Sequence, residues 1–264
     1  MSSYPKSDID FIRDHGNAWL YTGERVLITG ATGFIGSWLA QVFAYQCDLT
    51  LDRDFVDGEY DVIFHFAPTK IEPVIECARK TNALVVYTSS GAVYGGVPKQ
   101  VTEDAKIQPK TAYGIEKAHA EKLLMESALD NRILRLFALS GKGLRNHFAL
   151  THFIEAVKSD KPMRVFGNGK QIRSYLYIAD VLVWMLRIID MGTNGVYNVG
   201  SEQAISIGEL ADRVSDYVHG HPIKHVQPYF VEPAPYYLPD CTRAREIGLH
   251  QRFDLEYAIR RMME

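Results

Sequence analysis

Three polar residues in the middle of the chain have the types and spacing needed to move a proton at a substrate oxygen. Tyr113 and Lys117 lie four positions apart in a helix-like segment, so both side chains should point to one face. A tyrosine has an ordinary pKa near ~10, and a neighbouring ammonium lowers that pKa by favouring the phenolate. Ser90 follows an apolar run and could hydrogen-bond the same oxygen. Together they predict proton transfer by Tyr113 while a nicotinamide takes the hydride.

A glycine-rich turn near the N-terminus could bind the phosphates of such a cofactor. Residues 26–29 form a short apolar run, Gly30, Gly33 and Gly36 follow it, and an apolar helix pattern begins at Phe34. Glycines let a pyrophosphate approach the backbone N–H groups and the positive end of the helix. A tight strand-to-helix turn without any ligand is the alternative interpretation.

The elements that must position these residues alternate between strand and helix. Apolar runs at 61–68, 83–88, 132–137 and 196–199 read as strands, separated by helical patterns at 71–80, 147–160 and in the segment that carries Tyr113. This order predicts an α/β fold, a Rossmann-like doubly wound parallel sheet with a smaller C-terminal substrate domain. Ser7 is expected to cap an N-terminal helix, Asp180 a later one, and Ser206 with Glu209 to form a capping box.

The first half of the sheet is too short for a complete dinucleotide fold. Only 24 residues separate Gly36 from Asp61, so one strand–helix unit is absent. Residues 47–55 could be the second strand, with Asp52 on the adenosine ribose, or the third, with Asp48 at the adenine. The connection length favours the third strand. In that case the ribose carboxylate is missing, and we expect weak dinucleotide binding with poor discrimination between NAD and NADP.

Composition narrows the functional class further. The 264 residues carry a net charge of −3 with the basic residues dispersed, which argues against a nucleic-acid partner. No apolar run reaches membrane-spanning length. Three distant cysteines, Cys47, Cys77 and Cys241, favour a reducing cytoplasm. The histidines at 219, 221 and 225 read as a solvated loop, so no metal site is expected.

Taken together, these motifs resemble the extended short-chain dehydrogenase/reductase family, in its nucleotide-sugar epimerase, dehydratase and 4-ketoreductase branch. The motifs are the three glycines, Ser90 in SSGAVYG, and Tyr113 with Lys117 in YGIEK. Downstream, GNGKQIRSYLYIAD and GVYNVGS resemble that branch's substrate-domain signatures. The resemblance implies a nucleotide-sugar substrate, NAD as the cofactor with NADP not excluded, and a homodimer.

The resemblance also assigns residues to each ligand. Catalysis would rest on Ser90, Tyr113 and Lys117. The substrate would contact Ser90, Gly91, Tyr113, Val165 and Arg173, with Arg173 on the diphosphate and the Val165–Phe166 segment near the base. The cofactor would contact Gly30, Thr32, Gly33, Phe34, Ile35, Gly36, Asp48, Leu49, Phe66, Ala67, Pro68, Thr88, Ser89, Tyr113, Lys117 and Phe137.

Departures from the family pattern leave the reaction open. Ala138 stands where the family usually has an asparagine that holds the sugar, and Gly91-Ala92 replaces the acidic pair that dehydratases carry. Sugar dehydration needs an acid for the leaving hydroxyl, so it is disfavoured. An epimerase acting at C4, a 4-ketoreductase, and a degenerate nucleotide-binding relative remain. We expect an arm at 1–24, a dinucleotide-binding domain at 25–145 and 171–199, and a substrate domain at 146–170 and 200–264.

Overall fold

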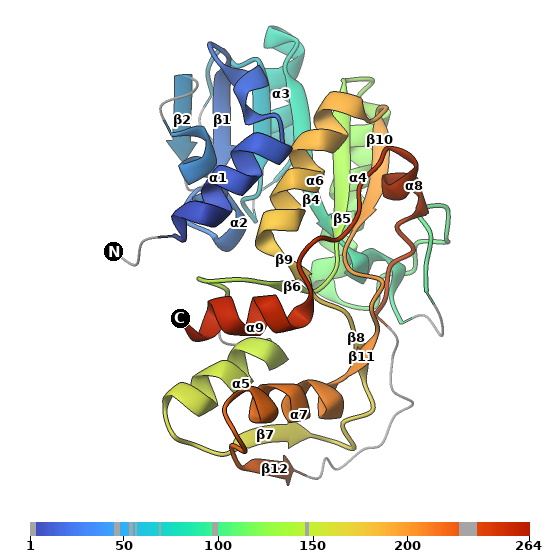
Figure 1. Cartoon of the computed structure of the whole chain (residues 1–264). Coiled ribbons are helices and arrows are strands. Elements are labelled where there is room, and N and C mark those ends of the chain that lie inside the picture. The colour runs from blue at the N-terminus through green and yellow to red at the C-terminus, as the bar shows by residue number, and fades with distance from the viewer. Residues whose placement is uncertain are drawn as a thin grey trace.

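The chain folds around a six-stranded parallel sheet (Figure 1). A computed structural model describes residues 4–44, 48–52, 55, 57–68, 70–96, 100–145, 148–226 and 237–264. The sheet order is β10-β5-β4-β3-β1-β2, and every neighbouring pair runs parallel. The strands are β1 Arg25–Thr29, β2 Asp48–Asp52, β3 Val62–His65, β4 Leu84–Ser90, β5 Asn131–Leu136 and β10 Gly195–Val199.

The position of β2 corrects the predicted strand assignment. β2 pairs directly with β1, on the side away from β3, which is the place of a second strand. The register sets Asp48 beside Arg25 and Asp52 beside Thr29, so Asp52 lies at the carboxyl edge of the sheet and Asp48 at the opposite edge. The absent unit is therefore the third strand and its helix. The expected lack of a carboxylate at the end of the second strand was wrong.

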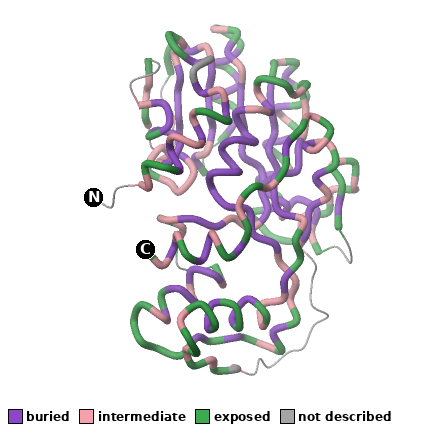
Figure 2. Tube along the Cα trace, viewed as in Figure 1, coloured by how far each residue is buried: buried purple, intermediate pink, exposed green. Residues whose placement is uncertain are grey.

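Helices cover both faces of the sheet, which confirms the doubly wound fold. Side chains of a strand alternate between faces, so Val26 and Ile28 enter one core while Leu27 enters the other. The first core packs against α1 Lys6–His15, α2 Phe34–Phe43 and α6 Ile178–Met191; the second packs against α3 Glu72–Thr81 and α4 Ala112–Glu126. Figure 2 shows burial concentrated in the central strands and along α6.

A smaller lobe lies beyond the carboxyl edge of the sheet (Figure 1). Its own core joins α5 Ala149–Lys158, α7 Ile207–Tyr217, α9 Leu255–Met263 and the parallel pair β7 Met163–Phe166 and β12 Ile223–Val226. Two short pairs connect it to the sheet: β8 Ile172–Arg173 with β11 Ile205–Ser206, and β6 Leu139–Ser140 with β9 Leu176–Tyr177. α8 Thr242–Glu246 packs against β10 of the large sheet, not against the smaller lobe. The predicted division of the chain into domains stays a prediction.

The observed helix N-caps agree with the predicted ones only in part. The Ser206–Glu209 capping box forms as predicted. The Ser7 cap was wrong, because α1 begins one residue earlier, after Pro5. The Asp180 cap was also wrong: α6 begins at Ile178, and the buried Asp180 carboxylate accepts hydrogen bonds from the backbone N–H groups of Arg252 and Phe253. Among the described residues, no helix is both long and apolar enough to cross a bilayer.

The N-terminal arm is fixed by one buried carboxylate. Asp8 on α1 is 1% exposed and accepts hydrogen bonds from Tyr177 Oη at 2.7 Å and Tyr257 Oη at 2.8 Å. The Arg261 guanidinium donates to it at 2.7 Å. The arm therefore joins the start of α6 to the C-terminal helix α9, two parts of the chain on either side of the boundary between the lobes.

Asp8→Asn should lower the free energy of unfolding by about 2–3 kcal/mol, because it removes the charge that Arg261 and two phenols share in a dry position. Urea denaturation monitored by circular dichroism measures the change. Asp14→Asn, at an exposed position on the same helix, is the matched control and should change stability little. Equal effects of the two substitutions would contradict a structural role for Asp8.

Candidate active site

The main cavity of the described structure lies at the carboxyl edge of the sheet, between the sheet and the smaller lobe. Its volume is about 1280 Å³. Ligands of open parallel sheets bind at this edge, where the strands deliver their following loops. Fifteen of the predicted site residues line it: Gly30, Thr32, Gly33, Phe34, Ile35, Gly36, Phe66, Pro68, Thr88, Ser89, Ser90, Tyr113, Lys117, Phe137 and Arg173.

The glycine turn is built so that only glycine fits. Gly30 has a φ of +64°, and a Cβ there would lie 2.9 Å from the Ala67 backbone nitrogen. A Cβ on Gly36 would lie 2.4 Å from the Gly30 carbonyl oxygen. α2 starts directly after Gly33, and no side chain in the described chain caps it. The first backbone N–H groups of α2 are therefore available to bind an anion, such as the pyrophosphate of a dinucleotide.

A buried pair behind the turn holds the neighbouring strand end in place. Thr29 Oγ1 lies 2.9 Å from His65 Nδ1 and accepts hydrogen bonds from the backbone N–H groups of Phe66 and Ala67, at 3.1 and 3.2 Å. This arrangement allows the Phe66–Ala67 peptide to pack directly against Gly30. The Ala67 side chain is buried and does not line the cavity, whereas Phe66 and Pro68 do.

The predicted catalytic residues come together at the centre of the cavity. Thr111 caps α4 by accepting a hydrogen bond from the Gly114 N–H, which places Tyr113 in the first turn of α4. Lys117 Nζ donates to the Thr88 carbonyl at 2.8 Å and lies 5.8 Å from the centre of the Tyr113 ring. Ser90, at the end of β4, lies close enough to Tyr113 to favour its ionised form.

Protonation equilibria at this centre differ from the prediction. Burial raises the pKa of Tyr113, the hydrogen bond with Ser90 opposes that shift, and Glu116 adds to it. The expected lowering by Lys117 was wrong for the protein alone, because burial raises the pKa of Tyr113 and Lys117 does not shift it. Burial also lowers the pKa of Lys117, to about 8, although Glu116 and Glu121 favour its charged form. At pH 7 the site therefore holds a neutral phenol beside an ammonium that is close to losing its proton.

Tyr237 is a site residue that sequence reasoning missed. Its phenol lies 3.3 Å from Ser90 Oγ, its ring centre lies 4.9 Å from that of Phe137, and the Arg173 guanidinium lies 5.7 Å above it. Tyr237 and Ser90 are 147 positions apart in the chain. No local motif marks Tyr237, so only the fold reveals that Ser90 is placed between two phenols.

Four further predicted contacts, in addition to Ala67, lie outside the cavity. Asp48 and Leu49 are at the start of β2, at the amino edge of the sheet, so the predicted adenine contact was wrong. The Val165 side chain is fully buried in the core of the smaller lobe, since it points to the opposite face of β7 from Phe166, which lines the cavity. Gly91 packs under Phe137 and Tyr237, where a Cβ would lie 2.8 Å from the Phe137 ring.

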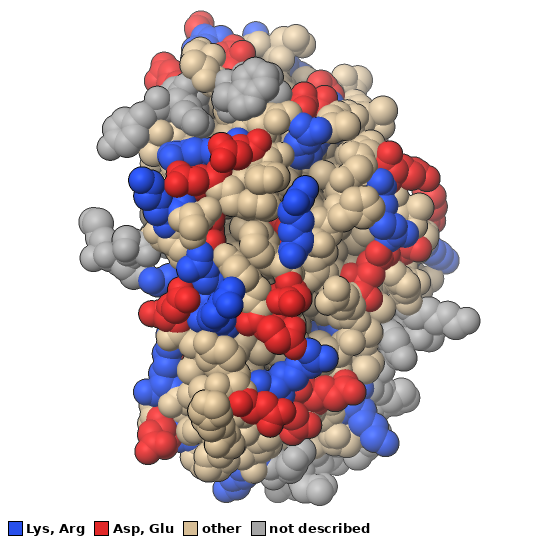
Figure 3. Space-filling model, in the orientation of Figure 1, with Lys and Arg blue, Asp and Glu red and all other residues tan. Residues whose placement is uncertain are grey.

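The cavity carries more positive charge than the protein as a whole. Its described lining includes Lys117, Arg145, Arg164 and Arg173 and contains no aspartate or glutamate, although the chain has a net charge of −3. On the face seen in Figure 3, by contrast, acidic and basic side chains are interspersed. A low-dielectric cleft lined by cations attracts and holds anionic ligands. The lining fits a ligand set rich in phosphates.

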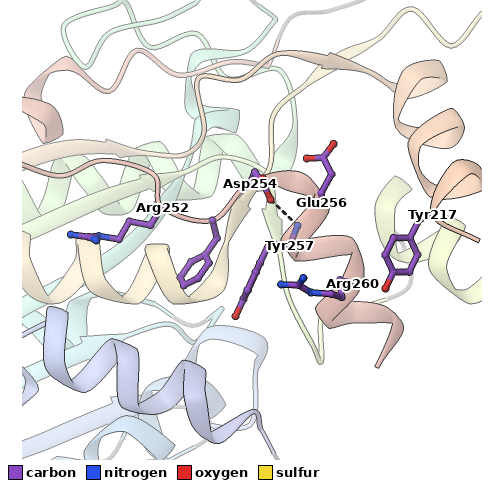
Figure 4. Close-up of a pocket in the computed structure, with 7 residues that line it drawn as sticks. Tyr217, Arg252, Asp254, Glu256, Tyr257 and Arg260 are labelled. Carbon is purple, nitrogen blue, oxygen red and sulfur yellow. Dashed lines mark hydrogen bonds between the residues drawn. The ribbon is translucent and has the colours of Figure 1, made fainter.

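A second cavity holds charged groups without a comparable arrangement. A smaller cavity of about 360 Å³ lies beside α9, where Arg260 lies between Tyr257 and Tyr217 (Figure 4). Its Asp254 caps α9 through the Tyr257 N–H, and its Glu256 pairs with Arg213. The described residues contain no group of histidine, cysteine and carboxylate side chains able to hold a metal ion.

Comparison with known proteins agrees with this geometry. Residues 71–200 match the model of the NAD-dependent epimerase/dehydratase family. The chain is 27% identical to a UDP-N-acetyl-alpha-D-glucosaminuronate decarboxylase of Bacillus cytotoxicus, over 85% of this chain and 91% of that protein. It is 22% identical to UDP-glucuronic acid decarboxylase 2 of Arabidopsis thaliana, of which it spans 64%.

Solved structures share the fold at low sequence identity. A UDP-N-acetylglucosamine 4-epimerase from Methanobrevibacter ruminantium superposes with a TM-score of 0.80 at 20% identity, over 92% of this chain and 97% of that one. A UDP-glucuronic acid 4-epimerase from Bacillus cereus, solved with UDP-glucuronic acid and NAD, gives 0.80 at 20% identity, over 90% and 97%.

Lys117→Met should change how stability depends on pH. In the wild type the folded protein loses the Lys117 proton near pH 8 while the unfolded chain keeps it to about 10.5, so stability rises with pH between these values. The variant lacks this contribution. The free energy of unfolding of wild type should therefore rise relative to that of Lys117→Met, by up to about 3 kcal/mol between pH 8 and 10.5.

Urea denaturation at pH 7, 8, 9 and 10.5 measures that difference. Lys122→Met, at an exposed position on the same helix, is the control and should show no such shift. A constant difference between wild type and Lys117→Met across the range would contradict a buried ammonium.

Proposed function

We propose that the chain, whose residues 71–200 match the NAD-dependent epimerase/dehydratase family, is an enzyme of the extended short-chain dehydrogenase/reductase type acting on a nucleotide-activated sugar. The proposed reaction interconverts a hydroxyl and a keto group at the sugar, at C4, and leads to epimerisation. The observation that carries the proposal is the meeting of the glycine turn with Ser90, Tyr113 and Lys117 in one cation-lined cavity.

NAD is the proposed cofactor, and the residues present fit it. The uncapped start of α2 and the glycine turn would hold the pyrophosphate. Ser89 Oγ, which is buried and has no hydrogen-bond partner among the described residues, has a spare hydrogen-bonding group for a ligand in the cavity. When bound, a nicotinamide dinucleotide supplies a reversible acceptor for the hydride of a carbinol carbon.

The side chains of this chain would control the proton. Ser90 holds the substrate oxygen by a hydrogen bond, and Tyr113 exchanges a proton with it. The raised pKa of Tyr113 keeps the phenol neutral at pH 7, so it is ready to donate to a keto oxygen. In the opposite direction a phenolate must form, and the Lys117 ammonium, 5.8 Å from the ring, stabilises that charge.

Two features of the site favour epimerisation over dehydration. Gly91 and Ala92 follow Ser90, and the described lining offers no carboxylic acid to protonate a leaving hydroxyl. Arg145 and Arg164 add two cations beyond Arg173, the proposed diphosphate ligand. This surplus charge makes a nucleotide-linked uronic acid a second candidate substrate, which suits the uronate enzymes among its relatives. Product analysis with UDP-glucose and UDP-glucuronic acid separates the two.

Tyr113→Phe should lower turnover by about 10² or more while stability changes little, because only the acid/base oxygen is removed. Product formation from the NAD-loaded enzyme measures it, and Tyr217→Phe, which lies outside the main cavity, is the control. Near-normal turnover of Tyr113→Phe would overturn the enzyme proposal. A wild type that binds both ligands without turnover would instead support the degenerate relative.

Asp52 should give the enzyme a preference for NAD over NADP, by about tenfold or more, because a carboxylate at the end of the second strand repels a 2′-phosphate. Its backbone carbonyl accepts a hydrogen bond from Ala31 in the glycine turn, at 3.1 Å, which fixes this strand end beside the turn. Titration of both dinucleotides into wild type and Asp52→Ala tests the preference. It should disappear in the variant; a preference that survives there would contradict the assignment.

A further inference from the structure

The Lys117 ammonium is buried without a carboxylate as its ion-pair partner in the described part of the chain. Lys117 is 8% exposed, and its Nζ donates a hydrogen bond to the Thr88 carbonyl at 2.8 Å. Two carboxylates of α4 favour its charged form, but Glu121 pairs with Arg135 and Glu116 is exposed. A buried charge is costly unless a close partner compensates for the lost water. Another group must therefore stabilise this ammonium.

The ring of Tyr87 lies where such a partner is needed. Lys117 Nζ lies over this ring, 4.7 Å from its centre. The centre of the Tyr113 ring is 5.8 Å away, but Tyr113 is 53% exposed whereas Tyr87 is 3% exposed. The negative face of an aromatic ring attracts a cation, and most strongly where water is excluded. The contact with Tyr87 is therefore the stronger of the two.

The neighbouring strands fix the orientation of the Tyr87 ring. In the sheet register Tyr87 on β4 lies opposite His65 on β3, which lies opposite Thr29 on β1. The rings of Tyr87 and His65 stack, with centres 5.9 Å apart and planes 18° apart, and Thr29 Oγ1 lies 2.9 Å from His65 Nδ1. Residues opposite one another in a sheet point to the same face, here the face covered by α3 and α4. The row therefore presents the Tyr87 ring to Lys117.

We propose that Tyr87 is a positioning residue of the active site: the face of its ring holds the Lys117 ammonium charged and in place beside Tyr113. This inference rests on the proposed function, in which that charge stabilises the Tyr113 phenolate.

Other charged and titratable groups surround Lys117 from α4 and from the elements packed against it. They are Tyr113, Glu116, Glu121, Tyr87, His65, Tyr94 and Arg135. Arg135 is bonded to both Glu121 and Tyr94, so these three groups are satisfied by one another. Removal of the Tyr87 ring should therefore act on the ammonium directly.

Tyr87→Leu should lower the pKa of Lys117 by about one unit from its value of about 8, because the charged form loses its partner. NMR titration of the lysine ε-carbons in labelled protein measures this pKa, and the signal that is missing in Lys117→Met identifies Lys117. Tyr87→Phe keeps the ring face and should leave the pKa of Lys117 unchanged. Tyr60→Leu, which removes another buried tyrosine from the same core, is the matched control and should also leave it unchanged.

The pH profile of turnover supplies a second measurement. Turnover needs the ammonium, so its alkaline limb should move to lower pH by the same one unit in Tyr87→Leu. Between pH 6 and pH 8, turnover of this variant should fall about fivefold more than turnover of wild type. A variant that is only looser would lose turnover at every pH without moving the limb.

The outcomes separate the role of Tyr87 from the proposed function. An unchanged pKa of Lys117 in Tyr87→Leu, an equal fall in Tyr87→Phe or Tyr60→Leu, or an unmoved alkaline limb would overturn the role of Tyr87. Turnover by wild type leaves the proposed function standing in each case. A wild type without turnover would overturn the proposed function instead, and the NMR titration, which needs no substrate, still decides whether the ring holds the ammonium.

Thermal melting shows whether each variant is folded. If Tyr87→Leu does not fold, trifluorophenylalanine at position 87 replaces it, because fluorine keeps the shape of the ring and withdraws electrons from its face. The pKa of Lys117 should then fall relative to that in Tyr87→Phe. Equal values in these two proteins would overturn the proposal.

Discussion

A buried ion pair between Arg135 and Glu121 fixes the parts of the fold that form the active site. The two side chains are 3% and 0% exposed, and Arg135 donates to both carboxylate oxygens, at 2.7 to 3.2 Å. Removing two charges from water costs several kcal/mol per ion, so such a pair persists only when its geometry is complete. Both N–H groups of Arg135 Nη1 are satisfied as well, because Nη1 donates to Tyr94 Oη and to the Glu103 carbonyl.

The pair joins the elements that carry the catalytic groups. Glu121 lies one helical turn beyond Lys117 on α4, and Arg135 is on β5, next to the strand that ends in Ser90. Tyr94 ends the short helix that follows Ser90, and its phenol donates to Asn198 on β10 at 2.7 Å. The distance between Ser90 and Tyr113 is therefore set by a polar network behind the site. A loop able to drift by an ångström could not keep proton transfer efficient.

Sequence reasoning succeeded where a single segment holds all the information. The glycine turn combines a strand, a left-handed glycine and a helix start within twelve residues, and the Tyr113–Lys117 pair needs only helical spacing. It failed where the position of a residue depends on pairing between distant segments. The sequence allowed β2 to be either the second or the third strand of the sheet, and only its pairing with β1 shows that Asp52 reaches the carboxyl edge. Val165 and Phe166 are neighbours in a strand, so their side chains point to opposite faces: that of Val165 into the core and that of Phe166 into the cavity. Tyr237 reaches Ser90 through a return of the chain that no local pattern marks.

The charge balance of the cavity links the stability of the protein to its ligands. The described lining includes four cations and no carboxylate, and burial lowers the pKa of Lys117, so its charged form is disfavoured in the protein alone. Phosphate groups of a bound dinucleotide or nucleotide sugar would relieve this, so the folded state should gain stability with each anionic ligand. The shape of the active site in the absence of ligand depends on the hydrogen-bonded network around Arg135 and Glu121. The cavity lining thus supplies positive charge for anionic ligands, while the ion pair behind it holds the catalytic residues in position.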